Sequence, residues 1–195
     1  MATRTYHHGN LRAALLERAE RTLEERGVQE LSLRELAREV GVSHAAPRRH
    51  FADKQALLDA LAEEGFARLA GEMDAAIAGA GGSWREQFGA FAAAYVRFAT
   101  EHATLLELMF AGKHRPGADR VREAADRAFA KPLALFVAGR QAGEIAGDAE
   151  RDGTIALATL QGIASLGNNG MLYDAPLEDV VAEAVDRLLL GLRPR

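Results

Sequence analysis

Residues 32–51 of the chain read SLRELAREVGVSHAAPRRHF, and they carry the clearest signal of how the chain folds. Apolar residues recur at helical spacing in its first half, and Gly41 then permits the positive φ that ends a helix and reverses the chain. Val42 is placed to fill the angle between two helices, and Ser43 can cap a second helix that runs to about His50. Two short helices joined by such a turn have the proportions of a helix-turn-helix motif.

The residues before this turn carry further helix signals. Ser32 and Glu35 have the spacing of a capping box, in which each side chain satisfies a free backbone amide of the first turn. Another helix is predicted upstream, with Asn10 as its N-cap and Gly27 at its end. The residues of the capped helix that we expect to face inward are Leu33, Leu36, Ala37 and Val40.

Helical periodicity also runs through the rest of the chain, where strand signals are absent. Asp53 is a good N-cap for a long helix, and Ser83 and Glu86 form a second capping box. Pro132 is expected to kink or divide the long segment that contains it. The later helices are predicted over residues 103–111, 117–146, 149–172 and 177–190.

The predicted fold class is therefore all-α. Residues 1–52 form a three-helix helix-turn-helix domain, and the helix over 53–79 links it to the rest of the chain. The glycine-rich stretch at 79–82 marks the boundary. Residues 83–195 form a second, C-terminal helical domain.

The composition excludes several classes of protein. With 195 residues, of which 48% are hydrophobic and 27% charged, the chain can build one ordinary domain or two small ones. It has no cysteine, which excludes disulfides, Cys-ligated metals and thiol nucleophiles. Because it lacks both a membrane-length apolar run and the apolar segment of a secretory signal, we expect a soluble cytoplasmic protein.

The net charge of −4 hides an asymmetry along the chain. Residues 1–62 contain ten Lys and Arg against nine Asp and Glu, and four of the six histidines as well. Residues 63–195 contain fourteen against nineteen. A near-neutral N-terminal part can bind DNA where its cations gather on one surface, even when the whole protein is acidic.

The segment after Gly41 is dense in cationic side chains. Such a short helix has little apolar surface to bury, so its exposed face needs a partner, and DNA is the most common one. An ordinary solvated face gives the same pattern, and spacing and charge alone leave both interpretations open. The cationic residues are His44, Arg48, Arg49 and His50, followed by Lys54.

Several spaced elements within residues 9–62 agree with one family pattern at once. They are Gly27, Ser32-Leu33-Arg34-Glu35-Leu36-Ala37, Gly41-Val42-Ser43, His50-Phe51, Lys54 and Leu57-Leu58. With these elements the segment resembles the N-terminal domain of the TetR family of bacterial transcriptional regulators. The stretch Tyr6-His7-His8-Gly9-Asn10-Leu11 resembles one subgroup of that family, in which Gln161-Gly162 would correspond to a His-Gly pair.

The resemblance implies a ligand-responsive DNA-binding regulator. It implies a repressor that binds a palindromic operator as a dimer and is released by a small hydrophobic effector. The family usually has Tyr where Arg48 stands, and an arginine there can contact a guanine or a phosphate. Phe51 is expected in the core, and Pro47 should distort the short helix. The implied DNA-contacting residues are Ser43, His44, Ala45, Arg48, Arg49, His50 and Lys54.

The C-terminal domain carries candidates for dimerisation and effector binding. In TetR-like proteins the last two helices pair across a two-fold axis, and the matching apolar positions are Ile155, Leu160, Ile163, Val181, Val185 and Leu188. The residues that could line an effector cavity are Phe88, Phe91, Tyr95, Phe98, Met109, Phe110 and Phe136, with Phe129, Leu133 and Val137 also on the long segment. Both sets also fit the core of a single subunit.

Two other classes of function stay open at this point. An all-α enzyme could use His102 or His114 as a base, and a helical interaction protein would need no affinity for DNA. The sequence has no Gly-rich phosphate loop and no nucleophile elbow. It also has no His pair at the i, i+4 spacing of a helical metal site. We therefore expect no enzyme activity, no cofactor and no metal.

Overall fold

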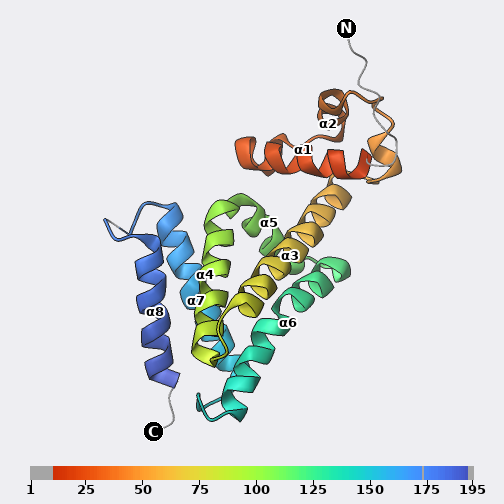
Figure 1. Ribbon diagram of the computed structural model, residues 1–195. Helices are drawn as coiled ribbons and strands as arrows, with labels where there is room; N and C mark the ends of the chain where they lie inside the picture. The colour runs from red at the N-terminus through yellow and green to blue at the C-terminus, as the bar shows by residue number, and fades with distance from the viewer. Residues whose placement is uncertain (1–10, 173, 193–195) are drawn as a thin grey trace. The chain divides into compact units, whose positions relative to one another are not determined.

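The computed structural model describes residues 11–172 and 174–192 (Figure 1). These residues form α-helices and two 3₁₀ helices and contain no strand, which confirms the all-α fold class. The helices are α1 (Leu11–Arg26), η2 (Val28–Glu30), α2 (Leu33–Val40), η3 (Pro47–Arg49), α3 (Lys54–Gly79), α4 (Trp84–Glu101), α5 (Ala103–Lys113), α6 (Asp119–Gln141), α7 (Ala149–Asn168) and α8 (Leu177–Leu192). The predicted N-cap Asn10 and the pair His7-His8 lie outside the described residues.

The chain divides into two compact units. The first unit comprises Met1–Gly65 and Thr104–Arg122, and the second comprises Phe66–Ala103 and Glu123–Arg195. Helices α3 and α6 therefore contribute residues to both units. The predicted domains, residues 1–52 and 83–195, are continuous in sequence, whereas each unit combines two separate stretches of the chain. The predicted domain boundaries stay a prediction.

The first unit is built on α1, which packs against α2. Leu15, Ala19 and Leu23 share the buried face of α1, in agreement with the predicted period, and Leu36 and Ala37 are the buried residues of α2. Phe51 is 2% exposed, as expected for a core residue. The inward positions Leu33 and Val40 are only half-buried, because they lie at the two ends of a helix that is eight residues long.

Two glycines end helices of the first unit as predicted. Gly27 follows α1 with φ 80°, and Gly41 follows α2 in the left-handed conformation with φ 78°. The backbone N–H of Gly41 donates to the carbonyls of Ala37 and Arg38, and Val42 N–H donates to Ala37 at 2.9 Å. These bonds satisfy carbonyls that would otherwise be free at the helix end.

The predicted capping box at Ser32 and Glu35 is wrong. The Ser32 side chain makes no capping hydrogen bond, and Glu35 Oε2 instead accepts bonds from Arg38 Nε and Nη2 at 3.1 and 2.6 Å. Because residues three apart are neighbours on a helix surface, Arg38 competes for the carboxylate that the box would need. The capping-box prediction used the serine and the glutamate but did not consider this arginine.

Two other predicted caps, at Asp53 and Ser83, are confirmed. Asp53 Oδ1 accepts a bond from Ala56 N–H at 2.8 Å and caps α3. The Ser83 hydroxyl accepts from Glu86 N–H at 3.2 Å, while Glu86 Oε2 accepts from Ser83 N–H at 3.1 Å, which completes the capping box of α4. The bonds from the Ser83 hydroxyl and backbone lower the pKa of Glu86.

Helix α6 runs from Asp119 to Gln141 without interruption, so Pro132 does not divide it. The Pro132 ring is buried, and the helix continues although proline cannot donate the backbone hydrogen bond of that position. The helix nevertheless ends earlier than predicted. Gly143 adopts φ 74° soon after Gln141 and redirects the chain before Asp148 caps α7.

The second unit is built on α4, which packs against α7 and α8, while α7 and α8 also pack against each other (Figure 1). Trp84 Nε1 donates to the carbonyl of Leu135 at 2.8 Å and ties α4 to α6. The Trp84 ring stacks on Phe88, and Phe136 lies edge-on to Phe88 with ring centroids 5.4 Å apart. In residues 11–172 and 174–192, none of the helices combines the length and apolar character that crossing a membrane requires.

Candidate functional site

The segment between Gly41 and α3 is a series of tight turns. It contains one short 3₁₀ helix, η3, and the α-helix predicted from Ser43 to His50 is wrong. In an α-helix the nitrogen of Pro47 would have to donate to the Ser43 carbonyl, and proline has no N–H. The backbone bonds therefore run three residues back, from Ala46 to Ser43 at 2.9 Å and from His50 to Pro47 at 2.9 Å.

This tight conformation leaves the predicted DNA-contacting side chains at the surface. All but one of them are exposed: Ser43, His44, Ala45, Arg48, Arg49 and His50. Lys54 is half-buried, because its Nζ donates to the carbonyl of Gln29 at 3.1 Å. Within the part of the chain that the structure describes, no acidic side chain forms an ion pair with Arg48 or Arg49.

A surface depression of the first unit brings three cationic side chains together. It is lined by Arg34, Arg48 and Lys54, with His44 beside them. The carboxylate that also lines it, Asp53, is already engaged in capping α3. The depression therefore presents more positive than negative charge to solvent, which suits a phosphate group.

Sequence reasoning missed Arg34. It lies in the first turn of α2, and its side chain is exposed. Arg34 belongs to one of the motifs that carry the family resemblance, but the resemblance implied no role for it. The signal that could have found it is its place in that turn, because the amides of a helix start and a nearby arginine both attract phosphate.

The second unit contains a cavity of about 440 Å³ between α4, α6 and α7. Of the predicted cavity residues, Phe91 and Phe136 line it, and Phe129 and Leu133 of the long segment line it as well. The complete lining is Phe91, Asp126, Phe129, Ala130, Pro132, Leu133, Phe136, Glu150, Gly153, Thr154 and Leu157.

The structure places the other predicted cavity residues elsewhere. Phe88, Tyr95 and Phe98 are fully buried in the core of the second unit. Met109 is buried and Phe110 half-buried, and both belong to the first unit. Large apolar residues at helical spacing occur both in cavity walls and in packed cores, so this spacing cannot distinguish the two. The polar lining residues Asp126, Glu150 and Thr154 are not part of an apolar pattern and were not predicted.

Tyr95 joins two helices of the second unit. Its hydroxyl donates to Gln161 Oε1 at 2.6 Å, and its ring is fully buried. Burial raises the pKa of the Tyr95 phenol above its ordinary value, so the hydroxyl keeps its proton and remains a donor. Gln161 therefore holds α7 against α4.

Most of the predicted dimer residues are covered within their own unit. Leu160, Ile163, Val181 and Val185 are buried, Leu188 is half-buried, and Ile155 is 48% exposed. Periodicity identified the apolar helices but not which of their faces is turned toward α4. The residues that do form an exposed small and apolar face along α7 are Ile155, Ala158, Gly162 and Leu166.

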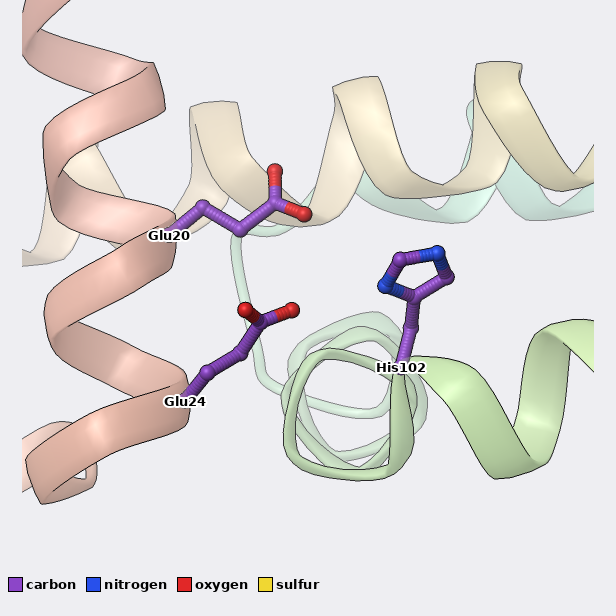
Figure 2. Close-up of side chains that lie close together, drawn as sticks. All are labelled: Glu20, Glu24 and His102. Carbon is purple, nitrogen blue, oxygen red and sulfur yellow. The ribbon is translucent and has the colours of Figure 1, made fainter.

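One group of potential metal ligands involves His102, which the sequence also singled out. Figure 2 shows Glu20 and Glu24 on successive turns of α1, and His102, which follows the last residue of α4. The His102 ring lies 4.9 Å from the Phe98 ring, centroid to centroid. Because these three side chains are divided between two units, they carry no assignment as a metal site.

Comparisons with known proteins bear on both parts of the chain. Residues 15–61 match the family model for bacterial regulatory proteins of the tetR family. Residues 88–192, more than half of the chain, match the model for a tetracyclin repressor-like C-terminal domain. A comparison with curated proteins found no match.

Solved structures share the fold of this chain. The chain is 49% identical to a protein with unknown function from Rhodococcus sp. RHA1, with a TM-score of 0.92 over 98% of this chain and 100% of that chain. It is 23% identical to the TetR family transcriptional regulator PfmR from Thermus thermophilus, with a TM-score of 0.70 over 92% and 99% of the two chains.

The fatty acid degradation regulator FadR from Bacillus halodurans is 16% identical, with a TM-score of 0.72 over 93% of this chain and 99% of that chain. At such identities PfmR and FadR share the fold alone. The two family models, by contrast, cover the helix-turn-helix segment and the C-terminal helices separately. The chain belongs to the TetR family of bacterial regulatory proteins.

Proposed function

We propose that the protein is a cytoplasmic transcriptional repressor that binds a palindromic DNA operator as a homodimer and is released by a small hydrophobic effector. The observation that carries the proposal is the exposed cationic turn from Ser43 to His50. Arg48 and Arg49 lie there without an ion pair to any described residue. Both arginines can therefore bind nucleic acid without first breaking an ion pair to a described residue.

Within this turn the two arginines have separate tasks. Arg48, which replaces the usual tyrosine of the family, reads a base edge, because its guanidinium can donate two bonds to O6 and N7 of a guanine. Arg49 and His50 hold the phosphate backbone beside it. Ser43, His44 and Ala45 precede them and are small or polar enough to approach the major groove.

A phosphate group fits the depression beside the turn. Arg34 and Lys54 flank it, and the Ser32 hydroxyl, which makes no capping bond, lies in its lining. The free amides at the start of α2 add donors of the same kind. Such a contact fixes the position of the turn on the duplex but does not by itself distinguish one sequence from another.

Dimerisation uses the exposed face of α7 together with α8. Ile155 and Leu166 are 48% and 41% exposed, and Ala158 and Gly162 between them allow a second helix to approach closely. An isologous pairing of this face places two reading segments on one duplex. Half-sites about 34 Å apart, or a small multiple, then set the spacing of the operator.

The effector occupies the cavity between α4, α6 and α7. Helices α3 and α6 both contribute residues to the second unit and to the first, so they are the covalent route by which an occupied cavity alters the reading segment. The effector lowers operator affinity only to the extent that it binds the non-matching conformation more tightly than the matching one.

Selection from a pool of random duplexes tests the proposal. We expect retention of one palindromic sequence by the ligand-free protein, with an affinity that falls as salt is raised. A duplex of the same composition in shuffled order is the control. If no sequence is enriched at low salt, or if enriched sites have no two-fold symmetry, the proposed function is wrong.

A further inference from the structure

The cavity of the second unit has walls that suit an aromatic or aliphatic guest. Phe91, Phe129 and Phe136 supply three phenyl rings, and Leu133 and Leu157 supply branched aliphatic surface. Its volume of about 440 Å³ lies within the range of sites that enclose a small organic molecule. The faces of phenyl rings carry negative charge density, so such walls accept a cation as readily as a neutral guest.

The charged groups at this cavity have one sign. Asp126 on α6 and Glu150 on α7 both line it, and among the described residues no lysine, arginine or histidine does. Both carboxylates are exposed. In the described part of the chain neither of them forms an ion pair.

The basic residues nearest to Asp126 along α6 are engaged with other acids. Arg122 pairs with Asp119, Arg127 pairs with Glu123 at 3.8 Å, and Lys131 pairs with Asp74 at 3.5 Å. The negative charge of Asp126 is therefore not neutralised by its neighbours on the helix. A cationic guest would supply the counter-charge that the protein does not.

The cavity is also poor in donors for an anion. Thr154 supplies the one hydroxyl that the described residues place in its lining, and this hydroxyl donates to the backbone carbonyl of Glu150 at 2.8 Å. The start of α7 carries a partial positive charge and one cation, Arg151, but Asp148, Glu150 and Asp152 outweigh them there. A carboxylate or phosphate guest would meet two like charges and no free hydroxyl donor.

We propose that the cavity takes a hydrophobic organic cation, a guest with delocalised or quaternary positive charge on an apolar body. This inference rests on the proposed role of the cavity as the effector site and adds the chemical class of the effector. The cationic centre lies near Asp126 and Glu150, while the apolar body fills the space between the phenyl rings.

Two ions of matched size and shape test the charge preference. Tetraphenylphosphonium and tetraphenylborate present the same four phenyl groups and opposite charges. Titration calorimetry with the full chain should give a dissociation constant about tenfold lower for the phosphonium, and this preference should shrink as salt screens the two carboxylates. Equal binding of the two ions, tighter binding of the borate, or no binding of the phosphonium would overturn the proposal.

Variants then locate the site. Asp126→Asn and Glu150→Gln should each weaken phosphonium binding about two- to fivefold, as expected for an exposed charge pair. Asp179→Asn removes a carboxylate of α8 that does not line the cavity, and it should leave the affinity unchanged. If the double variant of Asp126 and Glu150 binds phosphonium as the parent does, while its melting temperature is unaltered, the assignment to this cavity is wrong.

The proposed function can fail independently. Operator binding by the ligand-free protein is measured without either ion, so its absence would count against the regulator proposal and leave the charge preference intact. A protein that binds its operator but prefers tetraphenylborate would keep the regulator proposal and refute the cation inference.

Discussion

The hydroxyl of Tyr95 donates a hydrogen bond to Oε1 of Gln161 at 2.6 Å and so joins α4 to α7 inside the second unit. Tyr95→Phe keeps the ring and removes only this bond. We expect a loss of about 1 kcal/mol in the free energy of unfolding. Urea unfolding followed by circular dichroism measures it, and an unchanged midpoint would mean that the bond contributes nothing to stability.

The same tyrosine predicts an alkaline pH dependence. Burial raises the pKa of the Tyr95 phenol in the folded protein, whereas the unfolded chain releases this proton at the ordinary value of about 10. The contribution of Tyr95 to the free energy of unfolding is therefore fully present below a pH of about 10 and is lost as the pH rises above that value. Between pH of about 9 and about 11 the parent should lose more stability than Tyr95→Phe, and parallel curves would contradict this.

Two serines at similar sequence motifs should differ on mutation. Ser83 accepts the Glu86 amide and caps α4, whereas Ser32 makes no capping bond at α2. Ser83→Ala should cost about 1 kcal/mol, and Ser32→Ala should change stability much less. Thermal unfolding of both variants makes the comparison, and equal losses would show that the contrast between the two helix starts is false.

A close contact at Gly139 predicts a further effect on stability. A Cβ at this buried residue would lie 2.4 Å from Trp84 Nε1 and 2.6 Å from Cε2 of the same ring, which is itself held by the bond to Leu135. Gly139→Ala should destabilise the protein by about 1–3 kcal/mol through overpacking.

Gly71 in α3 is the matched control for that variant. It is exposed within a helix, and a methyl group added to its Cα would have no neighbouring atom within 4 Å. Gly71→Ala should therefore stabilise the helix, by up to about 1 kcal/mol. If both variants lose stability, the expected gain from helix propensity is wrong, and the loss at Gly139 cannot be assigned to the contact with Trp84.

More of the fold than of the candidate site could be predicted from the sequence. Helix starts at Lys54, Trp84, Ala149 and Leu177 follow caps or prolines that are visible in the sequence, because capping chemistry is local. The short helix after Ser43 could not be predicted correctly from its cap alone. Pro47 removes a backbone donor there, and the chain responds with 3₁₀ turns rather than with a distorted α-helix.

The cavity was only partly predictable, because its wall depends on how helices face one another. Phe88 and Phe91 have the same helical spacing signal, yet Phe88 packs under Trp84 whereas Phe91 lines the cavity. Asp126 and Glu150 resemble any solvated carboxylate in the sequence. Only the position of α6 beside α7 within the second unit gives them a common role.

The exposed face of α7 predicts which substitution would break the proposed dimer. Leu166 is 41% exposed in its own unit, so Leu166→Glu should leave the unit folded and convert dimers to monomers in sedimentation velocity. Val137 on α6 is equally exposed, and Val137→Glu serves as the control that should remain dimeric. If Val137→Glu dissociates and Leu166→Glu does not, the proposed interface lies on the wrong helix.

Titration of the selected operator by fluorescence anisotropy measures whether the cationic turn recognises DNA. Arg48→Ala should lose about 1–3 kcal/mol of binding free energy and discriminate less at one base pair, whereas Arg49→Ala should weaken all sequences alike and reduce the salt slope by about one. Arg140→Ala, at an exposed arginine of the second unit, should bind as the parent does. Undiminished operator affinity in the double variant of Arg48 and Arg49 would contradict the account.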